Sequence, residues 1–193
     1  MERSSISESS VTQNNETHGG LGGRELRRVV YSEAQIRQRV GELGAEATEH
    51  YGPGGDLLVV GLLKGSFIFM ADLVRTIRRP LNVDFLVASS YGSGTESSGH
   101  VRLLYDPEAS FRDRHILLVE DIIDSGTTLE QLVPQLLARE PRSLEICTLL
   151  HKRKANLSLE ARWVGFEAPN EFLVGYGLDF AEDFRHLPFI GSI

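Results

Sequence analysis

The residues best suited to chemistry lie in one short segment past the middle of the chain. Glu120 and Asp121 follow the apolar run 115–119, and the small, hydroxyl-bearing stretch 124–128 precedes the helical pattern of 129–136. Small residues at a helix start expose backbone N–H groups where the helix dipole is positive, so this stretch can bind a phosphate or simply cap the helix. Two adjacent carboxylates at the end of an apolar strand repel each other unless a cation or a polyhydroxylated ligand lies between them. Together these features predict a site for a ribose 5-phosphate with Mg²⁺.

Alternating strand and helix patterns should place this segment at an edge of a sheet. Ser32 and Gln35 have the spacing of a capping box, before a helix that closes near Gly52. Apolar alternation and short buried runs predict strands, whereas 3.6-residue periodicity predicts helices. The predicted strands are 56–63, 83–91, 101–105, 115–119, 143–150, 162–166 and 172–178, and further helices follow residues 66 and 128. This order is typical of an α/β sheet with helices on its faces, where ligands bind at the carboxyl ends of strands.

Length and composition favour a single domain that works in solution. The chain has 193 residues, of which 41% are hydrophobic and 24% are charged, and one domain takes roughly 100 to 200 residues. The longest apolar stretches fall short of the roughly 20 residues that span a bilayer. The net charge of −7 argues against binding along nucleic acid or an anionic membrane. The single cysteine, Cys147, lies in an apolar run and is expected to pack in the core.

The N-terminal residues differ in composition from the rest of the chain. Residues 1–23 are rich in Ser, Thr, Asn, Gly and Glu, with few sizeable apolar side chains. Such a stretch cannot bury enough surface to offset its ordering entropy, so we expect a disordered tail before a domain that spans 24–193. It lacks the apolar run of a secretory signal and the character of a transit peptide. A cytoplasmic location is therefore expected.

Several separated segments resemble purine phosphoribosyltransferases. Residues 119–129 read VEDIIDSGTTL and are similar to the phosphoribosyl pyrophosphate signature of these enzymes. The segments that match the hypoxanthine(-guanine) branch in particular are 63–66, 89–92, 150–153 and 172–179. The resemblance covers roughly residues 26–193. It implies the type I phosphoribosyltransferase fold, in which helices flank a parallel-core sheet and the terminal regions form a small hood. It also implies a purine salvage reaction, in which a 6-oxopurine displaces pyrophosphate from phosphoribosyl pyrophosphate to form IMP or GMP.

The same resemblance implies a role for each site residue. Asp124 is the implied general base near N7 of the purine. The residues implied to bind phosphoribosyl pyrophosphate are Lys64, Gly65, Ser90, Tyr91, Glu120, Asp121, Ser125, Gly126, Thr127, Thr128 and Arg185. Those implied to bind the purine are Lys152, Phe172, Leu173 and Asp179. Mg²⁺ is the implied cofactor, with Glu120, Asp121 and Asp179 as its ligands.

Alternatives remain open for single residues and for the function. Lys64 is also compatible with a solvated turn residue, and Arg185 with a surface ion pair. Phe172 is compatible with a core aromatic, and Asp124 with a helix cap. A xanthine-preferring enzyme would share every site residue. A regulator that senses phosphoribosyl pyrophosphate would need the phosphate site but neither Asp124 nor Lys152. A transferase should retain both.

Three further expectations follow from the resemblance. The family commonly forms homodimers or homotetramers, and it tends to have a non-proline cis peptide at the position of Leu63–Lys64. A loop that begins at Ser90 and Tyr91 and continues through 92–99 should close over the site. His151 departs from the residue types expected beside the purine-binding Lys152, which leaves the ranking of hypoxanthine, guanine and xanthine open.

Overall fold

The structure is a computed structural model that describes residues 24–90, 101–105, 107, 109–152 and 158–193. The predicted disordered tail, Tyr91 and the loop 92–99 lie outside these residues. Within the described part of the chain, no helix is long and apolar enough to cross a membrane.

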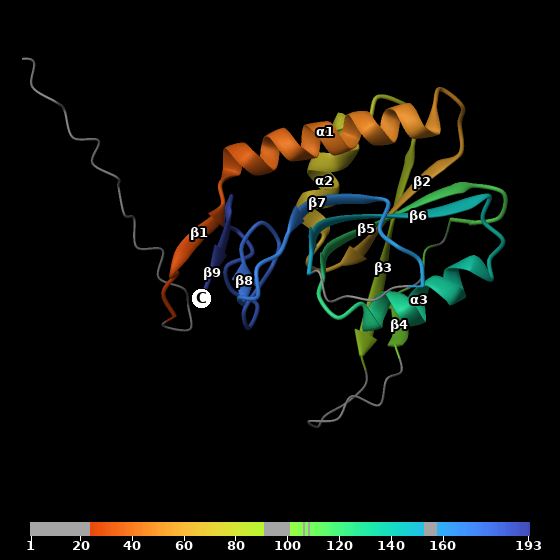
Figure 1. The fold of residues 1–193 in the computed structure, drawn as a ribbon. Helices are drawn as coiled ribbons and strands as arrows, with labels where there is room; N and C mark the ends of the chain where they lie inside the picture. The colour runs from red at the N-terminus through yellow and green to blue at the C-terminus, as the bar shows by residue number, and fades with distance from the viewer. Residues whose placement is uncertain (1–23, 91–100, 106, 108, 153–157) are drawn as a thin grey trace, which may run out of the picture.

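Six strands form the central sheet in the order β4-β3-β2-β5-β6-β7 (Figure 1). They are β2 (Leu57–Leu63), β3 (Asn82–Ser90), β4 (Val101–Tyr105), β5 (His115–Ile123), β6 (Ser143–His151) and β7 (Trp163–Glu167). Every neighbouring pair is parallel except β3 and β4, which are antiparallel. The aliphatic runs of β2 and β5 are buried on both faces, as in sheets covered on both sides. The predicted parallel-core α/β sheet is confirmed.

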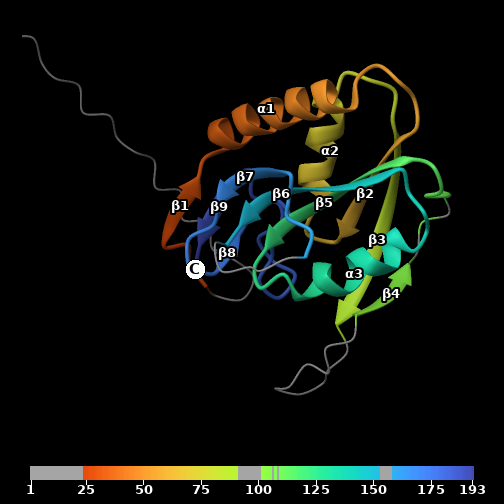
Figure 2. The same cartoon turned by 45° about the vertical axis from the view of Figure 1, so that its right-hand side comes forward.

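Helices pack on both faces of the sheet (Figure 2). α1 (Glu33–Tyr51) and α2 (Phe67–Thr76) cover one face, and α3 (Thr127–Leu137) covers the other. α1 begins at the predicted capping box, because Ser32 Oγ accepts from Gln35 N while the Gln35 side chain accepts from Ser32 N. Cys147 is buried in the core beneath α1 and α2, as predicted.

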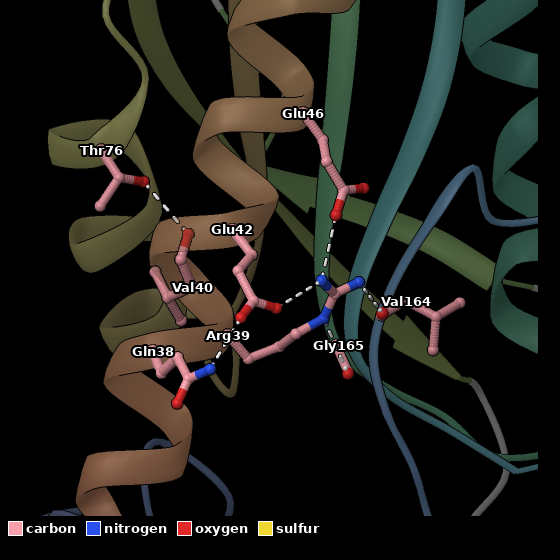
Figure 3. Close-up of polar contacts among 8 residues, drawn as sticks. All are labelled: Gln38, Arg39, Val40, Glu42, Glu46, Thr76, Val164 and Gly165. Carbon is pink, nitrogen blue, oxygen red and sulfur yellow. Dashed lines mark hydrogen bonds and ion pairs between the residues drawn. The ribbon is translucent and has the colours of Figure 1, made fainter.

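Arg39 ties α1 to the edge strand β7 (Figure 3). Its Nε donates to Gly165 O at 3.1 Å, and its Nη2 donates to Val164 O at 3.0 Å. Its Nη1 pairs with Glu42 and Glu46 at 3.0 Å each. One planar guanidinium therefore satisfies two strand carbonyls and two helix carboxylates, which holds α1 along this edge of the sheet.

The two ends of the described chain meet in a small second sheet, the hood. β1 (Arg28–Tyr31) pairs antiparallel with β9 (Ile190–Ser192), and β9 pairs antiparallel with β8 (Leu173–Val174). A hood built from the terminal regions agrees with the expectation. Its strands β1 and β9 were not predicted, because strands of three or four residues are too short to produce a recognisable alternation.

The predicted strand 172–178 is wrong in its extent. β8 contains only residues 173 and 174, and the chain then turns back on itself so that Gly175 bridges Leu178. Gly175, Tyr176 and Gly177 have φ values of 96°, 51° and 104°, which lie in the left-handed region that no strand can use. We call residues 175–177 the hood turn.

Candidate active site

The acidic pair lies within β5, and not in the loop where it was predicted. β5 continues past Val119 to Ile123, because β6 is equally long and stays in register up to His151. Successive side chains of a strand point to opposite faces. Glu120 accordingly lines a hollow at the start of α3, whereas Asp121 lines a larger cavity on the hood side.

The hollow at the start of α3 has the form of an anion site. The chain turns at Gly126, whose φ of 81° is left-handed, and α3 begins at Thr127. Ser125 Oγ lies 3.0 Å from Thr127 Oγ1, so both hydroxyls face the same turn. The hollow has a volume of about 100 Å³ and is lined by Glu120, Ile122, Ile123, Asp124, Ser125, Gly126, Thr127, Thr128 and Leu129. First-turn N–H groups and hydroxyls on a positive helix end suit a phosphate.

The electrostatics of the acidic pair favour a cationic or hydroxylated ligand. Burial raises the pKa of the Glu120 carboxyl well above its usual range, and the neighbouring Asp121 raises it further. Burial also raises the pKa of Asp121, although hydrogen bonds and the Arg185 charge oppose this. Glu120 Oε2 is buried without a hydrogen-bond partner among the described residues. A buried acceptor of this kind costs free energy until a ligand satisfies it.

Gly65 lies directly against Asp121. A Cβ on Gly65 would meet Asp121 Oδ2 at 1.7 Å, which leaves no room for a side chain. Gly177 of the hood turn approaches the same loop, since a Cβ on Gly177 would meet Gly65 O at 2.1 Å. The peptide bond at the start of this loop, Leu63–Lys64, is cis, as expected. The 64–66 loop is therefore held between β5 and the hood turn.

Two cations lie at this loop and pair with acidic residues of the C-terminal segment. Lys64 Nζ lies 3.1 Å from Glu182 Oε1. Arg185 Nη1 donates to Gly177 O at 2.8 Å, and its Nη2 lies 2.9 Å from Asp179 Oδ1 and 3.2 Å from Glu182 Oε2. Lys64 and Arg185 thus meet through Glu182, although 121 positions separate them in sequence. Two positive side chains beside an approachable loop backbone can bind a polyphosphate.

A second pair of charged residues faces the hood. Lys152 Nζ donates to Asp124 Oδ2 at 2.7 Å, and Lys152 N donates to Ile123 O at 2.9 Å. Phe172 is 53% exposed and makes an edge contact with Phe180 at 5.6 Å between ring centroids. The cavity here measures about 250 Å³ and is lined by Asp121, Ile122, Asp124, Lys152, Glu171, Phe172, Leu173, Leu178 and Asp179. An exposed aromatic ring beside a donor and an acceptor suits a flat heterocycle.

These contacts bring most of the predicted site residues together at the carboxyl ends of β2, β5 and β6. The hollow and the cavity share Ile122 and Asp124. Ser90 is the last residue of β3. Its side chain and Tyr91 lie outside the part of the chain that the structure describes. Glu182 is a contact of both cations that was not predicted, although it lies in an acidic segment of the sequence, residues 181–185.

The carboxylates fit a metal ion whose other ligands are substrate oxygens and water. Among the described residues, no cluster of three or more His, Cys, Asp and Glu side chains could hold a metal. Mg²⁺ commonly uses one or two carboxylates together with substrate phosphates and water, and the unpartnered Glu120 oxygen is a suitable donor. Asp179 is less available, since its Oδ1 pairs with Arg185 and its Oδ2 accepts from Glu182 N at 2.8 Å.

Comparison with known proteins places the chain in a family. The model of the phosphoribosyl transferase domain matches residues 30–181, a span that contains the sheet and nearly all of the site. The protein belongs to the phosphoribosyltransferase family. Within that family it is similar to hypoxanthine phosphoribosyltransferase from Escherichia coli, at 49% identity over 169 residues, which cover 86% of this chain and 94% of the relative.

Two further relatives support the same branch of the family. Hypoxanthine-guanine phosphoribosyltransferase from Dictyostelium discoideum is 43% identical over 171 residues, covering 86% of this chain and 95% of that protein. The crystal structure of a hypoxanthine-guanine phosphoribosyltransferase from Bacillus anthracis has a TM-score of 0.82 at 44% identity, covering 88% and 99% of the two chains. The type I phosphoribosyltransferase fold expected from the sequence is confirmed.

Proposed function

We propose that the protein is a hypoxanthine phosphoribosyltransferase of purine salvage, which also accepts guanine. It transfers phosphoribose from phosphoribosyl pyrophosphate to the purine and releases pyrophosphate. The relatives of that name support this function at the level of the whole chain. The single observation that carries it at the site is the pair formed by Lys152 and Asp124, 2.7 Å apart in the cavity that the exposed Phe172 also lines.

The spacing of this pair matches one edge of a 6-oxopurine. O6 and N7 are neighbours on that edge, so one purine can meet both partners of a close lysine–aspartate pair. Lys152 donates to O6, and Asp124 accepts the N7 proton as general base. N9 of the purine bonds to C1 of the ribose as the bond from C1 to pyrophosphate breaks. Adenine has an amino group in place of O6, and Lys152 cannot donate a hydrogen bond to it. A site that hydrogen-bonds the correct base in this way discriminates strongly against adenine. A sensor of phosphoribosyl pyrophosphate would have no need of this pair.

The remaining residues bind the phosphoribosyl donor. Ser125, Gly126, Thr127 and Thr128 bind the 5'-phosphate at the start of α3, and Glu120 and Asp121 face the ribose hydroxyls. Lys64, the Gly65 backbone and Arg185 bind the pyrophosphate and stabilise the charge that develops on it as it leaves. Since little covalent chemistry falls to the protein, positioning and charge stabilisation account for most of the catalysis. Leu173 contributes backbone contacts to the purine, and Ser90 and Tyr91 carry the loop that excludes water.

Mg²⁺ accompanies the donor in this proposal. Glu120, Asp121 and Asp179 are the residues that would hold it, and the ion would neutralise charge on the pyrophosphate oxygens. Asp179 must first release Arg185 or the Glu182 amide to contribute an oxygen. We also propose that the protein acts in the cytoplasm on small-molecule substrates, as a homodimer or homotetramer. Light scattering on the purified chain measures the oligomer size directly.

Nucleotide formation with four purines in parallel tests the function. Hypoxanthine, guanine, xanthine and adenine are each supplied with phosphoribosyl pyrophosphate and Mg²⁺. We expect turnover with hypoxanthine and guanine, little with adenine, and none after a chelator removes the metal. Preference for xanthine would replace the substrate assignment, and binding of the donor without turnover on any base would favour the sensor.

A matched pair of variants links the activity to the site. Asp124→Asn should lower kcat by about 10²- to 10⁴-fold, the usual contribution of general acid–base catalysis. Asp113→Asn is the control, because Asp113 precedes β5 at the opposite end of the strand. Asp113 has a φ of 60°, a conformation that asparagine also tolerates. Equal activity in both variants would remove Asp124 from the mechanism.

A further inference from the structure

A hydrogen bond outside the substrate site joins α2 to the hood turn. Tyr176 Oη donates to Asp72 Oδ2 at 2.6 Å, across 104 positions of sequence. Tyr176 is 5% exposed and belongs to the main hydrophobic core. The other carboxylate oxygen of Asp72 pairs with Arg75, one turn further along the same helix.

An adjacent cavity and the backbone conformation of Tyr176 make this hydrogen bond a specific connection between α2 and the hood turn. Tyr176 and Asp72 line a cavity of about 600 Å³ between α1, α2 and residues 186–188. Tyr176 packs in the same apolar cluster as Phe69, Met70 and Leu73 of α2, and the open space beside it leaves part of this interface unfilled. The hydrogen bond therefore adds a defined polar connection between α2 and the hood turn. Tyr176 also holds a left-handed φ of 51°, which is uncommon for a bulky residue and fixes the direction of the turn.

The hood turn is in contact with the residues that bind pyrophosphate in the proposed function. The Gly177 carbonyl accepts from Arg185 Nη1 at 2.8 Å, and Gly177 N donates to Arg185 O at 3.0 Å. Gly177 also approaches Gly65 closely, because an added Cβ would lie 2.1 Å from Gly65 O. A shift of the turn would therefore displace the guanidinium of Arg185 and the backbone of the 64–66 loop together.

Helix α2 links the 64–66 loop to Asp72. It starts immediately after the 64–66 loop, and Ser66 Oγ donates to Leu62 O at 2.7 Å beneath it. The Asp72 carboxylate lies on the second turn of this helix. The 64–66 loop is thus connected to the hood turn at two points, through Gly65 against Gly177 and through Asp72 bound to Tyr176.

We propose that Tyr176 and Asp72 are positioning residues for the pyrophosphate group of the donor. Their hydrogen bond holds the hood turn against α2 at the spacing that brings Arg185 and the Gly65 backbone onto one ligand. The inference rests on the proposed function for the identity of that ligand. Neither residue lines the 250 Å³ cavity assigned to the purine or the hollow assigned to the 5'-phosphate.

Removal of the phenol hydroxyl tests the proposal. Tyr176→Phe keeps the ring in the core and should raise KM for phosphoribosyl pyrophosphate and Kd for inorganic pyrophosphate by about three- to tenfold, the range of one hydrogen bond. KM for hypoxanthine should stay within about twofold. Asp72→Ala should give the same pattern, and the double variant should add little, because both changes remove one interaction. Asp72→Asn should restore part of the affinity, since its carbonyl oxygen still accepts.

Two control variants separate positioning from general destabilisation. Tyr51→Phe removes another buried tyrosine hydroxyl, one with no hydrogen-bond partner among the described residues. Arg75→Ala removes the other partner of Asp72 and leaves the bond to Tyr176 intact. Both should leave the two affinities unchanged. If Tyr176→Phe weakens hypoxanthine and pyrophosphate equally, or if the effects of the two single variants add, the proposal is wrong.

Pyrophosphate binding, measured by calorimetry, does not depend on turnover. A wild-type protein that binds pyrophosphate but makes no nucleotide would overturn the proposed function and leave this inference to be decided by the variants. Wild-type protein that fails to bind pyrophosphate would overturn the inference itself. Should Tyr176→Phe fail to fold, Asp72→Ala at the exposed end of the contact provides the same comparison.

Discussion

The contact between Gly65 and Asp121 leads to a prediction with a calculable size. In Gly65→Ala the new methyl group would lie 1.7 Å from Asp121 Oδ2, whereas an ordinary carbon–oxygen contact needs about 3.5 Å. Either the carboxylate or the 64–66 loop must therefore move by roughly 1.5 to 2 Å. Gly177 blocks a retreat of the loop toward the hood turn, since it already lies against Gly65 O.

A displacement of this size should be visible in activity and in stability. Misplacement of a catalytic group by about 1 Å can cost roughly 10²-fold, so kcat/KM for phosphoribosyl pyrophosphate should fall by about that factor, equivalent to about 2.7 kcal/mol of transition-state stabilisation. Overpacking should also reduce the free energy of unfolding by about 1 to 3 kcal/mol. At this chain length, that lowers the Tm by about 2 to 12 °C.

The assay pairs steady-state kinetics with thermal unfolding in the wild type and three variants. Gly41→Ala is the control, because Gly41 lies within α1 and an added Cβ meets nothing within 4 Å. It should keep full activity and gain about 0.5 to 1 kcal/mol of stability. Adding Asp121→Ala to Gly65→Ala should restore stability without restoring activity, since it removes the clash together with a donor ligand. Activity within threefold of wild type in Gly65→Ala would refute the reasoning.

Three further predictions concern buried or partly buried polar groups. Glu120→Gln should raise the ligand-free free energy of unfolding by about 0.5 to 2 kcal/mol in urea titrations, because the buried carboxylate oxygen lacks a partner; a loss of stability would contradict this. Burial and the Arg142 charge lower the pKa of His115 below 6.5. The unfolded chain therefore takes up this proton first, so stability should fall as pH drops below about 6.5, and His115→Gln should reduce the slope of urea midpoint against pH. Burial raises the pKa of the Cys147 thiol, so iodoacetamide should modify the native protein far more slowly than the urea-unfolded chain; equal rates would show that the thiol is accessible.

The central sheet could be predicted from the sequence because its signals are local. The aliphatic runs of β2 and β5 and the capping box at Ser32 each lie within a few neighbouring residues, and each agrees with the structure. The cis peptide at Leu63–Lys64 was expected from family resemblance alone. The end of β5 was placed too early because polar residues after an apolar run look like a loop. Pairing with β6, a non-local interaction, extends the strand to Ile123.

The hood could not be derived in the same way, because its structure depends on contacts between distant residues. The spacing of apolar residues in 172–178 is compatible with a strand, and nothing local shows that Tyr176 turns out of it. Its hydroxyl binds Asp72 and its neighbour Gly177 lies against Gly65, both more than 100 positions away. The left-handed φ of Tyr176 is stable only where such contacts exist.

The two cations of the proposed pyrophosphate site differ in how firmly they are held, and this indicates their order of action. Lys64 and Glu182 are 67% and 65% exposed, so their ion pair contributes little and pyrophosphate can replace the carboxylate at small cost. The Arg185 side chain is only 19% exposed and is fixed by the Gly177 carbonyl and by Asp179. Arg185 is therefore preorganised for a ligand, whereas Lys64 must exchange partners as the donor enters. In the proposed function, Glu182, which contacts both cations, would be the residue that the donor displaces. Glu182→Gln should therefore lower KM for phosphoribosyl pyrophosphate in steady-state assays, and an increase would contradict this order.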